Sequence, residues 1–332
     1  MYKNLCLTIV MTLLMGISAS AQVFVQNTMY AFNRYLYNPG AAGIPGGGNF
    51  EGGANLTLLG RLQWMGVGGG PKLFGATFNA PLESLSSGIG AYAVRDELGP
   101  LASTGLNVSY AYHLRLGEGD NSPTLSIGAA GGLHQKAING NFIYNDDNGP
   151  DPLVPVGNFS SSSMVPSLVA GLYLTWPEDK FFVGVSGHDL LEPDLEDLLL
   201  TSGVGQDSRI PRSFYLMAGY TFDLNTDFRL QPTFLARTDG VSTQFDISVN
   251  GTLKNLFVFG VSHRWQDSFA GMFGFRVSDR SFIGYSYDYT TSGLNANRDL
   301  NTHEVILSYN FPGGGRTPTG KDNVKDKPGG LR

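Results

Sequence analysis

Strict alternation of apolar and polar side chains is the feature that most limits the folds open to this chain. From Leu106 to Leu114, apolar side chains on one face oppose Asn, Ser, Ala and His on the other. Successive side chains of a strand point to opposite faces of a sheet, so the pattern predicts strands with one apolar face. The same pattern recurs at 214–222, 245–250, 283–289 and 304–311.

Applied to the whole chain, this reasoning predicts about fourteen strands, an even number as in bacterial outer-membrane barrels. The predicted strands are 52–59, 73–79, 87–95, 103–114, 124–133, 166–175, 180–188, 213–223, 227–236, 243–251, 256–264, 267–277, 281–289 and 302–311. The fold class predicted is therefore all-β, a transmembrane antiparallel outer-membrane β-barrel. A soluble β-sandwich is the alternative, because alternation alone does not say which face meets lipid.

Connection lengths distinguish these two folds. Connections after odd-numbered strands average about fourteen residues and those after even-numbered strands about five, as in a barrel with long outer loops and short periplasmic turns. The longest are 134–165 and 189–212. A sandwich offers no reason for this sorting, so a barrel whose chain starts in the periplasm is favoured.

The first residues have the pattern of a secretory signal: Lys3, an apolar stretch from Leu5 to Met15, and the small residues Ala19 to Ala21. We expect cleavage after Ala21, so that the mature chain begins at Gln22. Cys6 lies inside the signal, which leaves the mature protein without a thiol. An exported chain without disulfides needs another source of rigidity, and a closed barrel supplies it.

Composition agrees with an outer-membrane location. The chain holds 45 Gly, 15 Tyr and 21 Phe, and its formal net charge of −6 is unsuited to nucleic acid. No apolar run of helical spanning length follows the signal. We expect outer-membrane lipid as the surroundings of residues 52–311 and a disordered periplasmic tail at 312–332.

Residues 22–51 are predicted to be an N-terminal segment separate from the barrel. From Gln22 to Gly43 the sequence is aromatic and lacks alternation, and Asn38-Pro39-Gly40 is a turn sequence. Because it follows the signal directly, we expect the segment on the periplasmic side, folded into the lumen as a plug or in contact with secretion machinery.

Several ordered motifs resemble a known family. They include Asn38-Pro39-Gly40-Ala41-Ala42-Gly43, Arg61-Leu62-Gln63-Trp64, Gly88-Ile89-Gly90, Ser109-Tyr110-Ala111-Tyr112, Gly284-Tyr285-Ser286-Tyr287-Asp288 and His303-Glu304. In this order they resemble the PorP/SprF family of type IX secretion proteins, over almost the whole mature chain. The sequence departs from the family's Asn-Pro-Ala-Tyr-Ala-Gly block at Gly40 and Ala42.

The resemblance implies a noncatalytic outer-membrane barrel that works with other type IX secretion components. It also implies a partner, the C-terminal signal domain of a secreted adhesin, whose export or surface anchoring the barrel supports. No cofactor is expected. A porin or a transporter of hydrophobic substrates is the alternative function, and a hydrolase at the barrel rim, using Ser186 and His188, is the least favoured.

The residues expected to contact a partner lie in the N-terminal segment and in two long connections. They are Tyr30, Tyr35, Asn38, Pro39, Arg61, Gln63, Trp64, Leu191 and Leu195. Arg61, Gln63 and Trp64 are expected in the first connection, where Arg and Trp anchor a protein partner. The alternative is a Trp at the membrane interface with Arg61 paired inside the barrel. Leu191 and Leu195 lie in an acidic strip, residues 189–198, read as an exposed amphipathic helix or a lid on the rim.

Charged residues on the polar face are expected to form a lumen charge network, paired rather than arranged as a transport path. Its members are Asp246, Arg264, Arg276, Asp288, His303 and Glu304. The cluster at 145–151 has carboxylates and amides but not the register of a calcium-binding loop, so a polar turn is predicted there and no metal.

Overall fold

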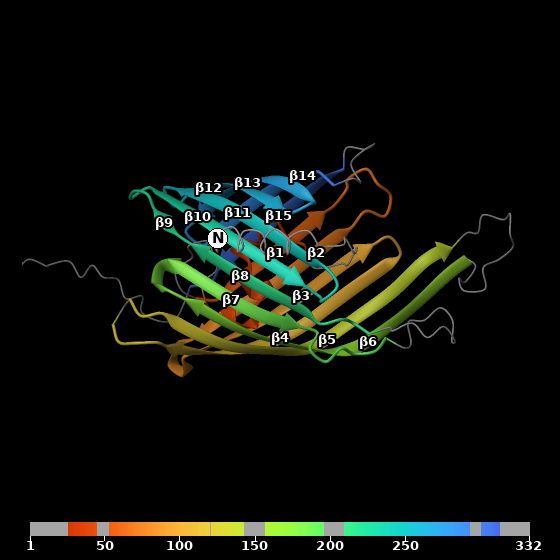
Figure 1. Ribbon diagram of the computed structural model, residues 1–332, viewed down its shortest axis with the longest axis horizontal. Coiled ribbons are helices and arrows are strands. Elements are labelled where there is room, and N and C mark those ends of the chain that lie inside the picture. The colour runs from red at the N-terminus through yellow and green to blue at the C-terminus, as the bar shows by residue number, and fades with distance from the viewer. Residues whose placement is uncertain are drawn as a thin grey trace, which may run out of the picture.

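A closed antiparallel β-barrel of fourteen strands forms the molecule, which confirms the predicted fold class (Figure 1). The computed structural model describes residues 26–44, 53–119, 121–142, 157–195, 209–292 and 300–312. Each strand pairs with the next along the chain, and the first, β1, pairs with the last, β15, from Asn55↔Asn310 to Leu62↔His303. This last pairing closes the sheet and leaves it without a free edge.

The strands of the described chain are numbered to β15 because one of them is interrupted. They are β1 (Asn55–Leu62), β2 (Lys72–Leu82), β3 (Ser87–Leu98), β4 (Leu101–Arg115), β5 (Thr124–Phe142), β6 (Gly157–Thr175), β7 (Phe181–His188), β8 (Ser213–Tyr220), β9 (Phe222–Asp223), β10 (Phe228–Thr238), β11 (Thr243–Leu253), β12 (Phe257–Arg264), β13 (Ser268–Ser278), β14 (Ser281–Thr290) and β15 (Asn301–Asn310). β8 and β9 both pair with β10 and are separated only by Thr221.

Five single-turn 3₁₀ helices accompany these strands in the described residues. They are η1 (Tyr30–Phe32), η2 (Arg34–Leu36), η3 (Pro39–Ala41), η4 (Glu83–Leu85) and η5 (Pro177–Asp179). None of the helices in the described ranges is long and apolar enough to cross a membrane.

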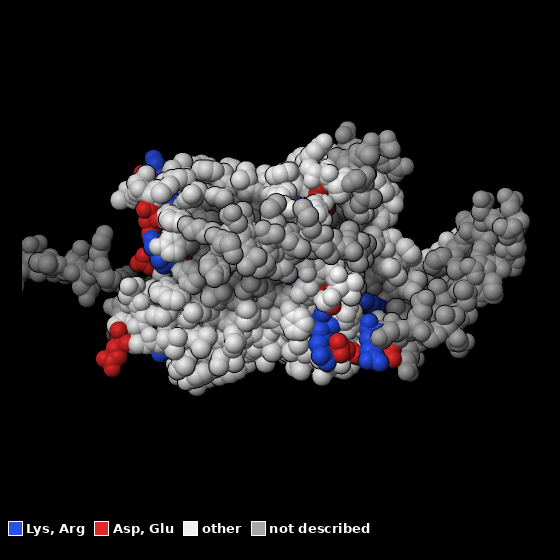
Figure 2. Space-filling model, in the orientation of Figure 1, with Lys and Arg blue, Asp and Glu red and all other residues white. Residues whose placement is uncertain are grey.

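Alternation places a mostly apolar set of side chains outside, whereas small, polar and some buried apolar side chains face inside. In β4, Val108 is 67% exposed, whereas the neighbouring Asn107 is only 5% exposed. The face drawn in Figure 2 has its Lys, Arg, Asp and Glu side chains at the two ends, with an uncharged band between them. An apolar outer band between charged ends is the surface that a lipid bilayer requires of a barrel.

The two ends of the barrel differ in their connections. Consecutive antiparallel strands put every second connection at the same end. The loop end, as we call it, carries the long connections 63–71, 143–156, 189–212 and 291–300. The turn end carries the shorter connections 83–86, 116–123, 176–180, 224–227, 254–256 and 279–280.

One predicted connection is much shorter than expected. Strands β5 and β6 continue to Phe142 and from Gly157, as a hairpin that projects beyond the rest of the wall (Figure 1). The sequence predicted that the first of these strands ends at residue 133 and that the second begins at residue 166. The outward side chains there include Ser160 and Ser162, so the apolar alternation that marks a lipid-facing strand is lost.

Candidate functional site

Residues 26–44, which we call the N-terminal segment, lie inside the barrel, and most of them are buried. Met29, Tyr30 and Tyr37 belong to the same core cluster as the inward-facing Leu59 and Ile306 of the wall. The hydrophobic core of this molecule is therefore the interior of the barrel, and the segment supplies its centre.

At the loop end, an ion-pair cluster holds the start of the segment. Arg61 donates to Asp288 at 2.7 Å and to Glu304 at 3.0 Å, and all three side chains are nearly fully buried. Glu304 also accepts hydrogen bonds from the backbone N–H groups of Thr28 and Met29, each at 2.8 Å. A buried charge is tolerated when it is paired and its remaining positions are hydrogen-bonded. Here Arg61 of the wall pairs the carboxylates, and the N-terminal segment supplies the further hydrogen bonds.

The same cluster continues along the neighbouring strands. Arg264 contacts Asp246 at 2.7 Å and Asp267 at 3.2 Å, and lies 3.9 Å from Asp288. Arg237 reaches the other oxygen of Asp246 at 2.9 Å. Sequence reasoning predicted Asp246, Arg264, Asp288 and Glu304 for this network but missed Arg237 and Asp267. Arg237 lies one residue beyond the predicted strand 227–236, and Asp267 is the first residue of the predicted strand 267–277.

Two residues predicted for the lumen charge network do not belong to this cluster. His303 faces outward on β15, where its Nδ1 lies 2.7 Å from the hydroxyl of Tyr285 on the outer surface. Including it in the lumen network was wrong, because alternation puts it on the opposite face from Glu304. Arg276 faces inward but near the end of β13 at the turn end, away from the loop-end cluster.

A second ion pair holds the segment at the turn end. Arg34 forms a two-pronged contact with Asp179 of η5, at 2.5 and 2.6 Å. It also donates to the Tyr173 hydroxyl at 3.1 Å, and its guanidinium lies 3.6 Å from the ring centre of Phe182. Sequence reasoning missed this pair. The available signal was that Arg34 is the only charged residue between Gln22 and Gly43.

The turn sequence Asn38-Pro39-Gly40 begins η3, with Asn38 as its N-cap, and packs against a wall of small residues. The Asn38 amide donates to the backbone oxygens of Leu172 and Val185, at 2.9 and 3.1 Å, and its oxygen accepts from Gly40 N–H. A Cβ at Gly128 would collide with the backbone of Pro39 and Gly40. Glycine in the wall therefore permits this close approach.

The predicted contact residues of the segment bind the wall. Tyr35 lies 2.8 Å from the Ser109 hydroxyl, and Tyr30 accepts a hydrogen bond from Thr233 at 3.0 Å. Tyr30, Tyr35, Asn38 and Pro39 are all buried. In this conformation none of them is exposed to a partner. The two tyrosines and Asn38 instead make hydrogen bonds to the inner face of the barrel wall.

The remaining predicted contact residues lie in the barrel wall and at the rim. Arg61 is the seventh residue of β1 and faces inward, so its placement in the first connection was wrong. Gln63 donates to Gln26 of the segment at 3.0 Å, and Trp64 is half-buried beside β15. Leu191 is exposed, whereas Leu195 packs in a small cluster with Val165 and Ile210.

The acidic strip is only partly described. From 189 to 195 it forms a turn and a single bridge, Asp194↔Arg209, so the expected amphipathic helix is absent from these residues. Positions 196–198 lie outside the described residues, as do the signal at 1–21, the carboxylate and amide cluster at 145–151 and the tail from 313. In the ranges that the structure describes, no group of His, Cys, Asp and Glu is arranged to hold a metal ion.

Ser186 and His188 converge on one backbone oxygen. The Ser186 hydroxyl donates to the carbonyl of Tyr37 at 2.6 Å, and His188 Nε2 lies 2.8 Å from the same oxygen. A nucleophile and its base need a hydrogen bond to each other. Here both groups instead fix the N-terminal segment to β7.

A cavity of 390 Å³ opens above the segment near the loop end. Leu36 and Tyr37 of the segment contribute to its lining, and Tyr92 and Tyr215 supply further aromatic surface. Its charged side chains come from the ends of strands and the adjoining connections: Asp96, Lys136, Asp189 and Asp239, with His134 and His188 beside them. Aromatic rings therefore lie beside carboxylates in this space, which we call the loop-end cavity.

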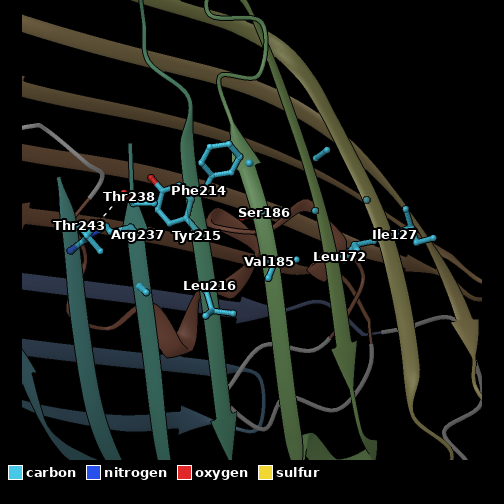
Figure 3. A pocket seen from close by; sticks show the side chains of 15 residues that line it. Ile127, Leu172, Val185, Ser186, Phe214, Tyr215, Leu216, Arg237, Thr238 and Thr243 are labelled. Carbon is cyan, nitrogen blue, oxygen red and sulfur yellow. Dashed lines mark hydrogen bonds between the residues drawn. The ribbon is translucent and has the colours of Figure 1, made fainter. Parts of the chain in front are cut away.

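The outer wall also has a hollow, lined almost entirely by apolar groups. It spans β5 to β11, and Figure 3 shows Ile127, Leu172, Val185 and Leu216 around it. Its volume is 540 Å³, and its inner surface includes Gly128 and Gly171. These small residues make the wall thin where η3 packs on the inside.

Solved structures of several outer-membrane proteins have a similar fold. The Ralstonia pickettii toluene transporter TbuX matches with a TM-score of 0.50 and 10% identity, over 89% of this chain and 97% of that one. Omp33 of Acinetobacter baumannii gives 0.45 and 8%, over 79% and 99%, and a Pseudomonas aeruginosa FadL homologue gives 0.43 and 14%, over 89% and 96%. A comparison with curated proteins gave no match.

The family model described as type IX secretion system membrane protein PorP/SprF matches residues 19–309. This range includes the N-terminal segment and nearly the whole barrel. The match confirms the resemblance seen in the motifs, and the barrel places the protein in the outer membrane of the cell. The chain belongs to the PorP/SprF family of type IX secretion membrane proteins.

Proposed function

We propose that this barrel supports the secretion or surface anchoring of an adhesin by binding the C-terminal signal domain of that cargo. The observation that carries the proposal is the position of the N-terminal segment. It occupies the lumen and is held by ion pairs at both ends, Arg61 with Glu304 and Arg34 with Asp179. A filled barrel suits a receptor better than a pore, and the loop end then offers the recognition surface.

The proposal places the loop end outside the cell, where long connections surround the loop-end cavity. A docking domain would meet exposed apolar side chains there, such as Leu191 and Val241. Membership of a secretion family supports a protein cargo rather than a small solute. Ser186 and His188 both contact the Tyr37 carbonyl oxygen, and this arrangement supports a noncatalytic role.

The experiment that tests this function is deletion of the gene, followed by proteomics of the cell surface and the medium. We expect one or more large proteins with a shared C-terminal domain to disappear from the surface. Complementation with the wild-type gene restores them. Unchanged surface and medium proteomes would contradict the proposal.

A matched pair of variants locates the docking surface. Val241 in the connection after β10 is 66% exposed at the loop end, and Leu224 after β9 is 58% exposed at the turn end. We expect Val241→Arg to weaken binding of the purified cargo domain about tenfold, because a large charge obstructs an apolar contact. Leu224→Arg should leave binding unchanged in the same surface plasmon resonance measurement. If Leu224→Arg weakens binding and Val241→Arg does not, the docking surface lies at the turn end instead.

A transporter of hydrophobic substrates is the second candidate. The apolar hollow of Figure 3 and the likeness in fold to a toluene transporter favour it. Liposome swelling separates the two candidates, because a porin or transporter admits solutes without cargo. Robust solute flux through the wild-type barrel would support this second function.

A further inference from the structure

We propose that the loop-end cavity binds the guanidinium group of an arginine side chain presented by the protein partner. The inference rests on the proposed function, because the partner is the docked cargo, and it names the chemistry by which that partner is held.

Negative charge exceeds positive charge in the cavity. Three carboxylates, Asp96, Asp189 and Asp239, face one ammonium, Lys136. Among the described residues, Asp189 has an ion-pair partner in His134 at 3.4 Å, whereas Asp96 and Asp239 have none. Two carboxylates without an ion-pair partner favour a positively charged ligand in this cavity.

Two side chains that line the cavity each have an acceptor oxygen without a hydrogen-bond partner among the described residues. Asp239 is only 9% exposed, and its Oδ1 accepts from the backbone N–H groups of Val241 and Ser242 at 2.9 and 2.8 Å. Its Oδ2 has no partner in the described chain, nor does Oδ1 of Asn107, which is 5% exposed. Both oxygens only accept hydrogen bonds, so a suitable ligand is rich in donors.

Aromatic rings select among donor-rich cations. Tyr92, Tyr215 and Tyr37 all line the cavity, and the rings of Tyr37 and Tyr215 lie 5.7 Å apart. A guanidinium is planar, carries five N–H donors, stacks on aromatic faces and is more weakly hydrated than an ammonium. It therefore matches the rings and the carboxylates together, while a carboxylate ligand would leave the wall oxygens unpaired.

Two soluble probes of equal shape test the charge requirement on the full-length barrel in detergent. N-acetyl-L-arginine amide carries the guanidinium, and N-acetyl-L-citrulline amide replaces it with a neutral urea. We expect saturable binding of the arginine probe in NMR titration and binding of the citrulline probe at least about tenfold weaker. Equal binding of the two probes, or no binding of the arginine probe at millimolar concentration, would overturn the proposal.

Three carboxylate variants locate the binding. Asp239→Asn and Asp96→Asn keep the shape of the side chain, and Asp239→Asn keeps the Oδ1 acceptor for the turn. Each should weaken the arginine probe about tenfold or more, because a charged acceptor is lost. Asp223→Asn, at the turn end beside Lys180, is the matched control and should change nothing. Wild-type affinity in both cavity variants would refute the site.

Folding of each variant is checked by its heat-dependent shift in electrophoresis. If a cavity variant fails this check, the salt dependence of binding to the wild-type barrel still tests the proposal. Binding of the arginine probe should weaken as ionic strength rises, and salt-independent binding would contradict a charged contact. The gene-deletion experiment remains separate: unchanged surface proteins with intact arginine binding would refute the cargo role alone. Lost surface proteins with no arginine binding would refute this site alone.

Discussion

At the scale of single residues, the interior is stabilised by pairing every buried charge that touches the N-terminal segment. Arg61 has Asp288 and Glu304, and Arg34 has Asp179. Removing one partner of such a pair leaves the others charged and unsolvated. The cost of that change is much larger than the net contribution of an exposed ion pair.

Arg61→Met should therefore destabilise the barrel by about 3–5 kcal/mol, since Glu304 remains buried without its cation and Asp288 keeps only Arg264 at 3.9 Å. Denaturant unfolding in lipid vesicles measures the change. The control is Arg95→Met, whose pair with Glu97 is 49% and 35% exposed. We expect a change below about 1 kcal/mol for the control. Equal effects of both variants would show that the Arg61 cluster contributes no more than a surface pair.

Arg34→Gln tests the pair at the turn end. It keeps one donor toward Asp179 but loses the second prong, the charge and the contact with the Phe182 ring. We expect the N-terminal segment to become accessible to protease while the barrel remains folded, because the pairing of β1 with β15 still closes the wall. Proteolysis resistance equal to that of the wild type would contradict an anchoring role for Arg34.

At the scale of elements, the position of η3 depends on which wall residues lack a side chain. Gly128 and Gly131 are both in β5, but only Gly128 faces the interior. An added Cβ at Gly128 would meet Pro39 and Gly40, whereas at Gly131 nothing lies within 4 Å. Of these two glycines of β5, only Gly128 permits packing of the segment.

Gly128→Ala should displace the segment and reduce stability by about 1–3 kcal/mol, the usual effect of overpacking. Limited proteolysis followed by mass spectrometry should then find cuts between residues 26 and 44. Gly131→Ala is the matched control and should remain resistant. Cleavage of neither variant would show that the wall accommodates the extra methyl group by a small shift.

At the scale of the whole molecule, the barrel wall and its contents have separate tasks. The outer surface supplies the apolar band that lipid requires, and the N-terminal segment supplies the core that would otherwise be an open channel. Ion pairs at the loop end and the turn end hold that core at two points. The wild-type barrel is therefore expected to conduct ions poorly.

Deleting residues 26–42 should open the lumen and produce steady single-channel conductance in planar bilayers. The reason is that the wall itself closes by the pairing of β1 with β15 and does not need the segment for its hydrogen bonds. Deleting residues 314–330, a stretch of equal length, is the control and should not raise conductance. A closed deletion variant that still shows heat-dependent mobility would contradict a plugging role.

Sequence alone determined the barrel and most of its strands. Each outward strand face meets lipid, so an apolar side chain is needed at every second position, and this requirement is local. Prediction failed at the hairpin of β5 and β6, where the outward face of β6 carries Ser160 and Ser162 and gives no apolar signal. The same alternation would have excluded His303 from the lumen had it been applied to that residue.

Only the tertiary structure decided the interior. Closure of the sheet brings Arg61 to Glu304 and Asp288, residues more than two hundred positions later in the chain. It also places Asp96 and Asp239 around one cavity above Tyr37. Strand periodicity states which side of the wall a residue occupies but not which residue it meets across the lumen. Those distances depend on the closure of the barrel and on the path of the N-terminal segment inside it.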